Sequence, residues 1–106
     1  MEQSLEEPSV VRNEDKSRFE IYAGDELAGF VQYRTDGQVI ELVHTEVGPR
    51  FQGEGLAGKL ARASLDAARA ANLAVLPYCP YINRWLIRHP DYADLVPADE
   101  RARFGL

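Results

Sequence analysis

The sequence contains one cysteine and two histidines, and this scarcity limits the sites that it can build. A single cysteine cannot form a disulfide within the chain, and two histidines without a cysteine cluster do not make the pattern of a structural zinc site. No apolar run approaches the length of a membrane span, and the N-terminus is acidic where a signal peptide would be basic and then apolar. These absences predict a cytoplasmic protein with no metal centre and no membrane partner.

Motifs for binding dinucleotides and nucleic acids are also missing. The glycines lack the Gly-x-Gly-x-x-Gly spacing of dinucleotide-binding folds, and no Gly-Lys-Ser or Gly-Lys-Thr occurs to form a Walker loop. Basic residues do not form a patch interleaved with aromatic residues, which disfavours nucleic acid as a partner.

Negative charge is concentrated in the N-terminal quarter of the chain. Residues 1–26 hold eight acidic and three basic residues and so account for the whole net charge of −5. This acidic segment indicates either that the protein acts on a cationic molecule or that the charge contributes to solubility. Three basic residues are close in sequence to a glycine-rich segment at 52–58: Arg50, Lys59 and Arg62. Their positive charge would attract an anionic ligand bound at that segment. A solvated helix face is the simpler interpretation of Arg62.

Hydrophobic periodicity predicts an α+β (mixed α/β) fold. Residues 1–17 are expected to be a polar tail or one short edge strand, and residues 18–106 a single domain. Three strands are predicted, at 18–23, 27–34 and 38–47. Turn signals at Gly24-Asp25 and Asp36-Gly37 favour an antiparallel meander, and the apolar third strand is expected to be central and buried on both faces.

The second half of the chain predicts a strand–helix–strand unit followed by a last helix. From Gly55 to Ala71 the apolar period changes to 3.6, which is typical of a helix packed on a sheet. Asn72 is expected to end this helix in a left-handed conformation, before a short strand at 73–76 that runs parallel to the third strand. Pro80 suits the first position of another helix, which ends at His89-Pro90.

The segment Gln52-Gly53-Glu54-Gly55-Leu56-Ala57 lies where the third strand gives way to the first helix. Glycines at such a junction let the backbone approach a ligand closely, and the first helical amides lack partners and carry the positive end of the dipole. Plain turns and close packing also use glycine in this position. The junction is therefore an anion site or a tight connection between two elements.

Written as Gln-x-x-Gly-x-Ala, this segment resembles the Gln/Arg-x-x-Gly-x-Gly/Ala pyrophosphate loop of the Gcn5-related N-acetyltransferases. Three more segments resemble the very small, stand-alone members of that family: His44-Thr45-Glu46-Val47, Pro77-Tyr78-Cys79-Pro80-Tyr81-Ile82 and Arg88-His89-Pro90-Asp91-Tyr92. The resemblance implies a truncated acetyltransferase fold with splayed central strands. Compared with the family, the chain lacks a helical pair and the last two strands, parts that commonly shape the acceptor pocket.

The resemblance implies acetyl-coenzyme A (acetyl-CoA) as the cofactor and an amine as the acceptor. Main chain at Val47 and Gly48 would pair with the pantetheine arm, and the Asn83 side chain would hydrogen-bond to it. The pyrophosphate would be held by the backbone amides of Gln52, Gly53, Glu54, Gly55, Leu56, Ala57 and Gly58.

His44 and Glu46 are the candidate general bases. They are two residues apart on the third strand and so point to the same side, and either could take the amine proton directly or through water. Regular alternation puts Thr45 on the other side, together with Glu41 and Val43. Each candidate has a second interpretation: His44 as a hydrogen-bonded structural residue, and Glu46 as an anchor for the loop through Arg50.

Cys79 is the third candidate catalytic residue. It would be the N-cap of the last helix, where the dipole favours a thiolate, and its place between Pro77 and Pro80 would keep one side of the residue unpaired with the sheet and near the cleft. There it would be an acylated nucleophile or the proton donor to the departing thiolate, it would react readily with alkylating agents, and cofactor would protect it. The alternative is a small buried core residue. Tyr78, Tyr81 and Tyr92 are other possible proton donors.

Three functions remain open at this stage. The first is an acetyl-CoA-dependent N-acetyltransferase that acts on a small-molecule or protein amine. The second is a non-catalytic acyl-CoA sensor or interaction module, which the truncation favours, and the third is a structural domain that binds no coenzyme A. An exposed strand edge could pair with a second copy, so the sequence allows both a monomer and a homodimer.

Overall fold

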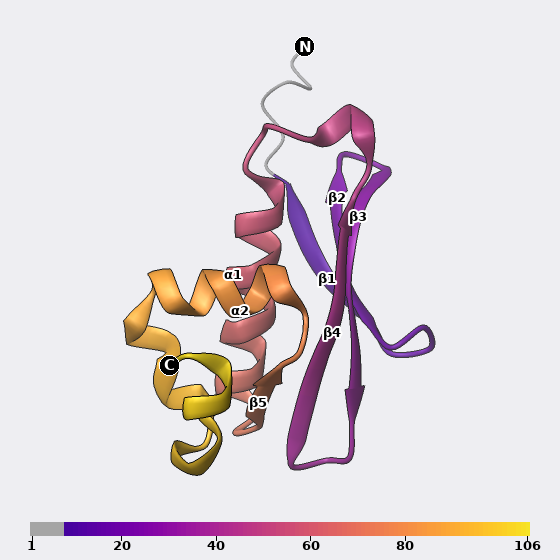
Figure 1. Cartoon of the computed structure of the whole chain (residues 1–106). Helices are drawn as coiled ribbons and strands as arrows, with labels where there is room; N and C mark the ends of the chain where they lie inside the picture. Colours follow the sequence, from indigo (N-terminus) through magenta and orange to yellow (C-terminus); the bar gives the residue numbers. More distant parts are fainter. Residues whose placement is uncertain (1–7) are drawn as a thin grey trace.

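The computed structural model describes residues 8–106, which form a five-stranded sheet and two α-helices (Figure 1). The elements follow in the order β1 (Ser9–Asn13), β2 (Arg18–Ala23), β3 (Glu26–Thr35), β4 (Val39–Val47), α1 (Leu56–Ala70), β5 (Ala74–Pro77) and α2 (Pro80–Arg88). Short 3-10 helices lie at Pro49–Phe51, Pro90–Leu95, Ala98–Glu100 and Ala102–Phe104. The predicted α+β fold is confirmed. Residues 1–7 of the expected polar tail lie outside the described part of the chain.

The strands lie in the sheet in sequence order, β1-β2-β3-β4-β5. The first four are antiparallel and form the expected meander, with β1 as the edge strand, and β5 runs parallel to β4 after the α1 crossover. The turn between β3 and β4 differs from the prediction, because its central residues are Gly37 and Gln38. The Asp36 amide donates to the Val39 carbonyl, and the Asp36 carboxylate accepts the amides of Gln38 and Val39.

A β-bulge at Val43 changes which side chains of β4 face the core. On β3, Gln32 pairs with His44 and Tyr33 with Leu42, so Val43 has no partner there and the alternation slips by one residue. Thr45 therefore shares the buried face with Leu42, instead of joining Glu41 as regular alternation predicts. The prediction that β4 is buried on both faces is wrong, because the face that carries His44 is exposed.

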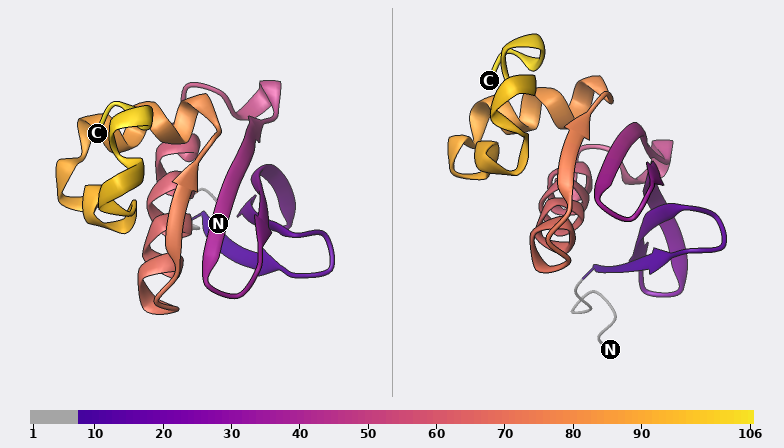
Figure 2. Two further views of the ribbon diagram at one scale, coloured as in Figure 1. Left: turned by 60° about the horizontal axis from the view of Figure 1, so that its bottom comes forward. Right: turned by 90° about the horizontal axis from the view of Figure 1, so that it is seen from below.

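Both helices pack on the same face of the sheet, called here the inner face (Figures 1 and 2). The row made by Phe19, Val31 and Thr45 lies on this face. Two rows define the outer face: Arg18, Gln32 and His44 form one, and Glu20, Phe30 and Glu46 form the other. Within residues 8–106 no helix covers the outer face (Figure 2).

Helix α1 turns its small and apolar residues toward the sheet. Those that are buried are Leu56, Leu60, Ala61, Ser64, Leu65 and Ala68. Ser64 is polar, but its hydroxyl donates to the Leu60 carbonyl one turn earlier, so the buried hydroxyl has a hydrogen-bond partner. Gly55 precedes the helix as its N-cap with φ 77°, and Asn72 follows it with φ 58°, the left-handed conformation that the sequence predicts.

Glu20 is a charged residue that is almost fully buried on the outer face, with 3% of its surface exposed. Its carboxylate accepts hydrogen bonds from Arg18 at 2.6 Å, from the Tyr22 hydroxyl at 2.9 Å and from the Asn13 amide at 3.1 Å. Burial by itself would raise the pKa of Glu20, but these hydrogen bonds outweigh it and hold the pKa below its ordinary value of 4.5.

We expect Glu20→Gln to destabilise the fold by about 1–3 kcal/mol at neutral pH, because it removes charge-assisted hydrogen bonds from a buried position. Since the folded-state pKa lies below 4.5, this contribution is complete well above pH 4.5 and is lost as the pH falls through the folded-state value. Urea unfolding at neutral and at strongly acidic pH measures the difference. Glu41→Gln, which removes an exposed ion pair with Arg34, is the control and should cost less than about 1 kcal/mol. A deficit of equal size at both pH values would contradict this account.

Candidate functional site

Strand β4 continues beyond its pairing with β5 and so has an open edge. The parallel ladder ends where Leu42 lies opposite Pro77, and the Cys79 amide adds one further hydrogen bond of 2.8 Å to the Leu42 carbonyl. Beyond that point, no strand within residues 8–106 pairs with this side of β4. The open edge is thus the segment from Val43 to Val47, on the side away from β3.

Backbone groups at the C-terminal end of β4 point to this open edge. The Gly48 amide donates to a carbonyl of β3 at 2.8 Å, which makes Val47 and Gly29 a pair without direct hydrogen bonds. The amide and carbonyl of Val47, and those of Thr45 two residues earlier, therefore face away from β3. Gly29 allows the two strands to lie this close, since a Cβ there would be 2.5 Å from the Glu46 carbonyl oxygen. An extended ligand could bind along this edge as a further strand would.

The loop between β4 and α1 brings unpartnered amides to the end of the open edge. Gln52 holds the loop in place, because its side-chain amide donates to the Val47 carbonyl at 3.1 Å. Gly53 and Gly55 have φ of 86° and 77°, which side chains rarely allow, and a Cβ at either would meet no atom within 4 Å. Within the described part of the chain, no side chain caps the first amides of α1. The two glycines thus keep space open in front of the positive end of the helix dipole.

The three basic residues near the loop differ in their contacts. Arg50 is held by Glu26 through hydrogen bonds of 2.6 and 2.9 Å, which raise the pKa of Arg50. Arg62 is more than a solvated residue, since its guanidinium lies 5.2 Å from the centre of the Trp85 ring and donates to the Tyr92 hydroxyl. Lys59 is exposed one turn into α1. Among the contacts of residues 8–106, Lys59 is the one of the three without a side-chain partner, so it can turn toward an anion at the loop.

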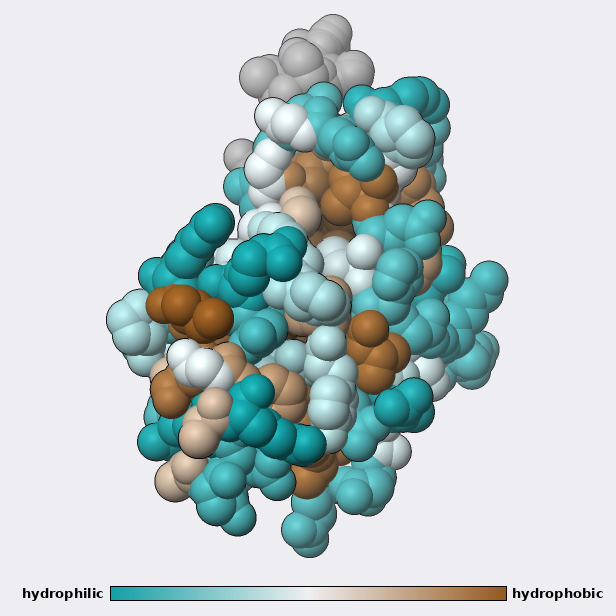
Figure 3. All heavy atoms as spheres, viewed as in Figure 1, coloured by the Kyte–Doolittle hydropathy of each residue, from teal (hydrophilic) through white to brown (hydrophobic). Residues whose placement is uncertain are grey.

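Apolar surface lies beneath this loop. In the space-filling view, hydrophobic residues are visible between the β4–α1 loop and the rest of the molecule, with polar side chains around them (Figure 3). Phe51, from the loop itself, packs against the hydrophobic core. The open edge therefore combines free backbone groups with neighbouring apolar surface, a combination that suits a long ligand of mixed polarity.

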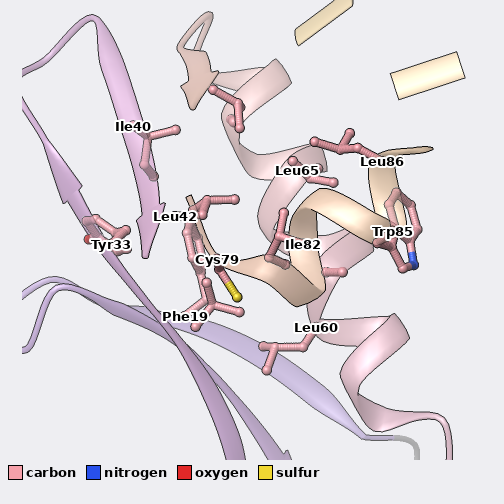
Figure 4. Close-up of a cluster of buried hydrophobic side chains, with 14 of the residues drawn as sticks. Phe19, Tyr33, Ile40, Leu42, Leu60, Leu65, Cys79, Ile82, Trp85 and Leu86 are labelled. Atoms are coloured by element: carbon pink, nitrogen blue, oxygen red, sulfur yellow. The ribbon is translucent and has the colours of Figure 1, made fainter. Parts of the chain in front are cut away.

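Cys79 is the N-cap residue of α2, as predicted, but its side chain is buried. Only 3% of its surface is exposed, and it lies in the hydrophobic cluster between the sheet and α2 (Figure 4). One side of the residue does pair with the sheet, since the Cys79 amide donates to the Leu42 carbonyl. The sulfur is 3.2 Å from the Thr45 hydroxyl. Thr45 was not predicted as a site residue, because only the bulge at Val43 turns it toward the sulfur.

Iodoacetamide should label native Cys79 slowly, about 10²-fold or more below the rate for the unfolded chain, because the sulfur must be exposed before it reacts. Cys79 is the sole cysteine of the sequence, so the mass of the labelled protein reports it alone. Mass spectrometry with and without denaturant gives the two rates. Rapid native labelling that coenzyme A prevents would instead support the accessible thiol that the sequence predicts.

His44 and Glu46 lie together on the outer face of β4. His44 Nε2 is 3.2 Å from Glu46 Oε1, and the two side chains are 60% and 61% exposed. Glu46 does not anchor the loop through Arg50, because Arg50 pairs with Glu26. The pair is therefore exposed on the outer face, and Cys79 is buried on the inner face. The open edge of β4 lies between them.

Tyr81 is the tyrosine whose hydroxyl lies against the first turn of α1. It would be 3.9 Å from a Cβ placed at Gly58, so the absence of a side chain there gives it room. Tyr92 is buried and donates to Asp66, and this hydrogen bond, with burial, raises the pKa of Tyr92. Tyr78 is exposed and is held by the C-terminal segment. Of the three possible proton donors, Tyr81 is thus the one next to the loop.

Asn83 is engaged by the C-terminal segment. Its side-chain nitrogen donates to the Phe104 carbonyl at 2.8 Å, and the Phe104 ring packs edge-on against Tyr78. This bond uses one of the two N–H groups of the Asn83 amide, which leaves the second N–H and the amide oxygen for a ligand. The sequence alone does not reveal this contact, because 21 residues separate the two partners.

In the part of the chain that the structure describes, no helix is long and apolar enough to cross a membrane. The same residues contain no group of three side chains that could hold a metal ion. Residues 18–95 match a protein-family model described as GCN5-related N-acetyl-transferase. The match includes β2 to α2 and so contains both the open edge of β4 and the glycine loop.

Proposed function

Because the chain belongs to the GCN5-related N-acetyltransferase family, we propose that it transfers the acetyl group of acetyl-CoA to an amine. The observation that carries this proposal is the open edge of β4, which runs into a loop with two left-handed glycines and unpartnered helix amides. The edge suits an extended arm that contains amides, and the loop suits a pyrophosphate. Coenzyme A has both parts.

The proposed cofactor site uses main chain more than side chains. The Val47 amide would pair with the pantetheine arm, whereas the Gly48 amide is already used by β3. The amides from Gly53 to Gly58 would hold the pyrophosphate, with Gln52 fixing the loop. Asn83 would contact the arm through its amide oxygen or its second N–H group.

The proposed chemistry divides the proton transfers between the two faces of the sheet. Acetyl-CoA supplies a thioester, whose C–S bond breaks as the C–N bond to the acceptor forms. Glu46, with His44 beside it, takes the proton that makes the ammonium a neutral amine and later releases it to water. The departing thiolate receives a proton from Cys79 through Thr45, or from Tyr81. The nitrogen loses its second proton as the amide forms, and this proton restores the donor.

A non-catalytic acyl-CoA sensor is the second candidate function. One observation favours it: within residues 8–106 no helix covers the outer face beside His44 and Glu46, so these residues do not enclose a small acceptor. Such a protein would retain the cofactor site and show no turnover. The buried side chain of Cys79 is compatible with both functions.

The test is mass spectrometry of the purified protein incubated with acetyl-CoA and a set of primary amines. We expect a noncovalent complex with the cofactor, followed by release of free coenzyme A and an equal amount of acetylated amine. Cofactor binding without release would favour the sensor. Absence of binding by acetyl-CoA and by coenzyme A would overturn both candidates.

A further inference from the structure

A groove between α1 and α2 lies on the side of α1 that faces away from the sheet. The buried residues of α1 face the sheet, and the residues that line the groove come from the opposite side of the helix. The groove has a volume of about 390 Å³ and is lined by Gly58, Lys59, Arg62, Ala63, Asp66 and Trp85. Of these residues, the proposed cofactor site uses Gly58 alone, through its amide. The groove is therefore a second concave surface beside that site.

Trp85 brings a buried hydrogen-bond donor to this groove. Only 7% of the residue is exposed, and its ring is stacked on His89 with 3.7 Å between the ring centres. Its carbonyl oxygen is 2.7 Å from His89 Nδ1, but within residues 8–106 the indole N–H has no hydrogen-bond partner, although a buried tryptophan usually finds one. The ring lies at the margin of the hydrophobic cluster, and its nitrogen is turned away from the apolar side chains (Figure 4). This nitrogen would be 3.9 Å from a Cβ built on Gly58, which places the donor at the end of the groove beside the first turn of α1.

Two cationic side chains line the same groove. Lys59 is exposed and has no side-chain partner within residues 8–106. The Arg62 guanidinium lies 5.2 Å from the centre of the Trp85 ring, and its hydrogen bond to the Tyr92 hydroxyl uses one of five N–H groups. Asp66, the acid among the six lining residues, is about 10 Å along α1 from Lys59 and accepts the Tyr92 hydroxyl. The Lys59 end of the groove therefore combines positive charge with unused donors.

These donors suit a phosphate monoester better than a carboxylate. A phosphate monoester carries nearly two negative charges and has three terminal oxygens that accept hydrogen bonds, whereas a carboxylate has one charge and two oxygens. The indole N–H supplies one directed hydrogen bond, and the ammonium and guanidinium groups supply charge-assisted ones. The first turn of α1, at the same end of the groove, adds the positive end of the helix dipole.

We propose that the groove between α1 and α2 binds a phosphate monoester, with one phosphate oxygen at the Trp85 indole N–H and the charge at Lys59 and Arg62. Free phosphate monoesters and the 3′-phosphate of coenzyme A share this chemistry. The site requires no acetyl transfer. It differs from the proposed pyrophosphate site in its ligands, which are side chains instead of loop amides.

The test follows the indole N–H of Trp85 directly. Trp85 is the sole tryptophan of the sequence, so ¹H–¹⁵N NMR spectra contain one indole resonance. Titration with inorganic phosphate at constant ionic strength should move this proton downfield to a saturating value. We expect Lys59→Gln to weaken this binding by about fivefold or more, because it removes a charge beside the phosphate. Arg84→Gln removes the same charge from an exposed residue of α2 outside the groove lining, and should change the affinity by less than about twofold.

Titrations with coenzyme A and with dephospho-coenzyme A, which lacks the 3′-phosphate, distinguish the two sources of the ligand. An indole shift with coenzyme A that dephospho-coenzyme A does not produce would identify the 3′-phosphate as the occupant. An indole shift with inorganic phosphate that persists in saturating coenzyme A would identify a free phosphate monoester. Both results support the groove as a phosphate site.

Three results would overturn the proposal: an indole resonance that neither inorganic phosphate nor coenzyme A moves, equal weakening by Lys59→Gln and Arg84→Gln, or equal shifts with both cofactors and none with inorganic phosphate. Calorimetry with dephospho-coenzyme A tests the proposed function separately, because this molecule retains the pantetheine arm and the pyrophosphate. If it binds and the indole resonance never moves, the groove proposal fails and the proposed function stands. If it does not bind and inorganic phosphate moves the resonance, the reverse holds.

Discussion

Gly55→Val should weaken coenzyme A binding by about 10²-fold or more, which corresponds to about 2.7 kcal/mol. Gly55 is the N-cap of α1 and has φ 77°, with no protein atom within 4 Å of a Cβ built on it. A valine side chain would therefore project into the space where the pyrophosphate is proposed to meet the helix amides, and would touch nothing else. Calorimetric titration with coenzyme A measures the loss.

Backbone strain in this variant needs a control, and Gly37 supplies it. Gly37 has φ 98° and equally open surroundings, but it lies in the β3–β4 turn, at the other end of β4 from the loop. Gly37→Val should therefore impose a similar strain, about 1–3 kcal/mol, and leave cofactor affinity unchanged. If Gly55→Val folds and binds coenzyme A as tightly as the unsubstituted protein, the ligand lies elsewhere and the proposed function loses its main support.

The order and direction of the elements could be predicted because they depend on local features of the sequence. The change of apolar period at Gly55 locates α1, and Asn72 and Pro80 mark the end of one helix and the start of the next. The bulge could not be predicted in this way. It arises from the pairing of β4 with β3, where Val43 finds no partner, and a residue pattern along one strand does not contain that information.

The parts of the candidate site that depend on local residues could also be predicted. The position of the glycine loop follows from the residues that form it, and Cys79 at the helix N-cap follows from Pro80. Burial of the Cys79 sulfur against Thr45 depends instead on the bulge. The pairing of Arg50 with Glu26 joins residues that are 24 apart in the chain, so the sequence alone suggested Glu46 as a partner for Arg50.

Glu46→Gln should lower the rate of acetyl transfer by about 10² or more while cofactor affinity stays nearly unchanged. Glutamine keeps the size of the side chain and can still hydrogen-bond to His44, but it cannot accept the amine proton. Cofactor affinity should persist because the Glu46 carboxylate lies on the outer face. Arg50, beside the loop, forms its salt bridge with Glu26 and so does not depend on Glu46. Steady-state rates at saturating acetyl-CoA, combined with calorimetry, measure both quantities.

Glu41→Gln is the matched control for this prediction, since it makes the same change on the same face of the same strand. Glu41 pairs with Arg34 near the β3–β4 turn, away from the open edge, so transfer should stay within about twofold. If His44→Gln lowers the transfer rate more than Glu46→Gln does, the imidazole of His44 is the general base and Glu46 orients it. Full activity of both variants would mean that water, and neither side chain, accepts the amine proton. Loss of cofactor binding in Glu46→Gln would contradict the separation of the two faces. The bulge at Val43 puts Glu46 on the outer face and Thr45 on the inner face, where its hydroxyl contacts the buried sulfur.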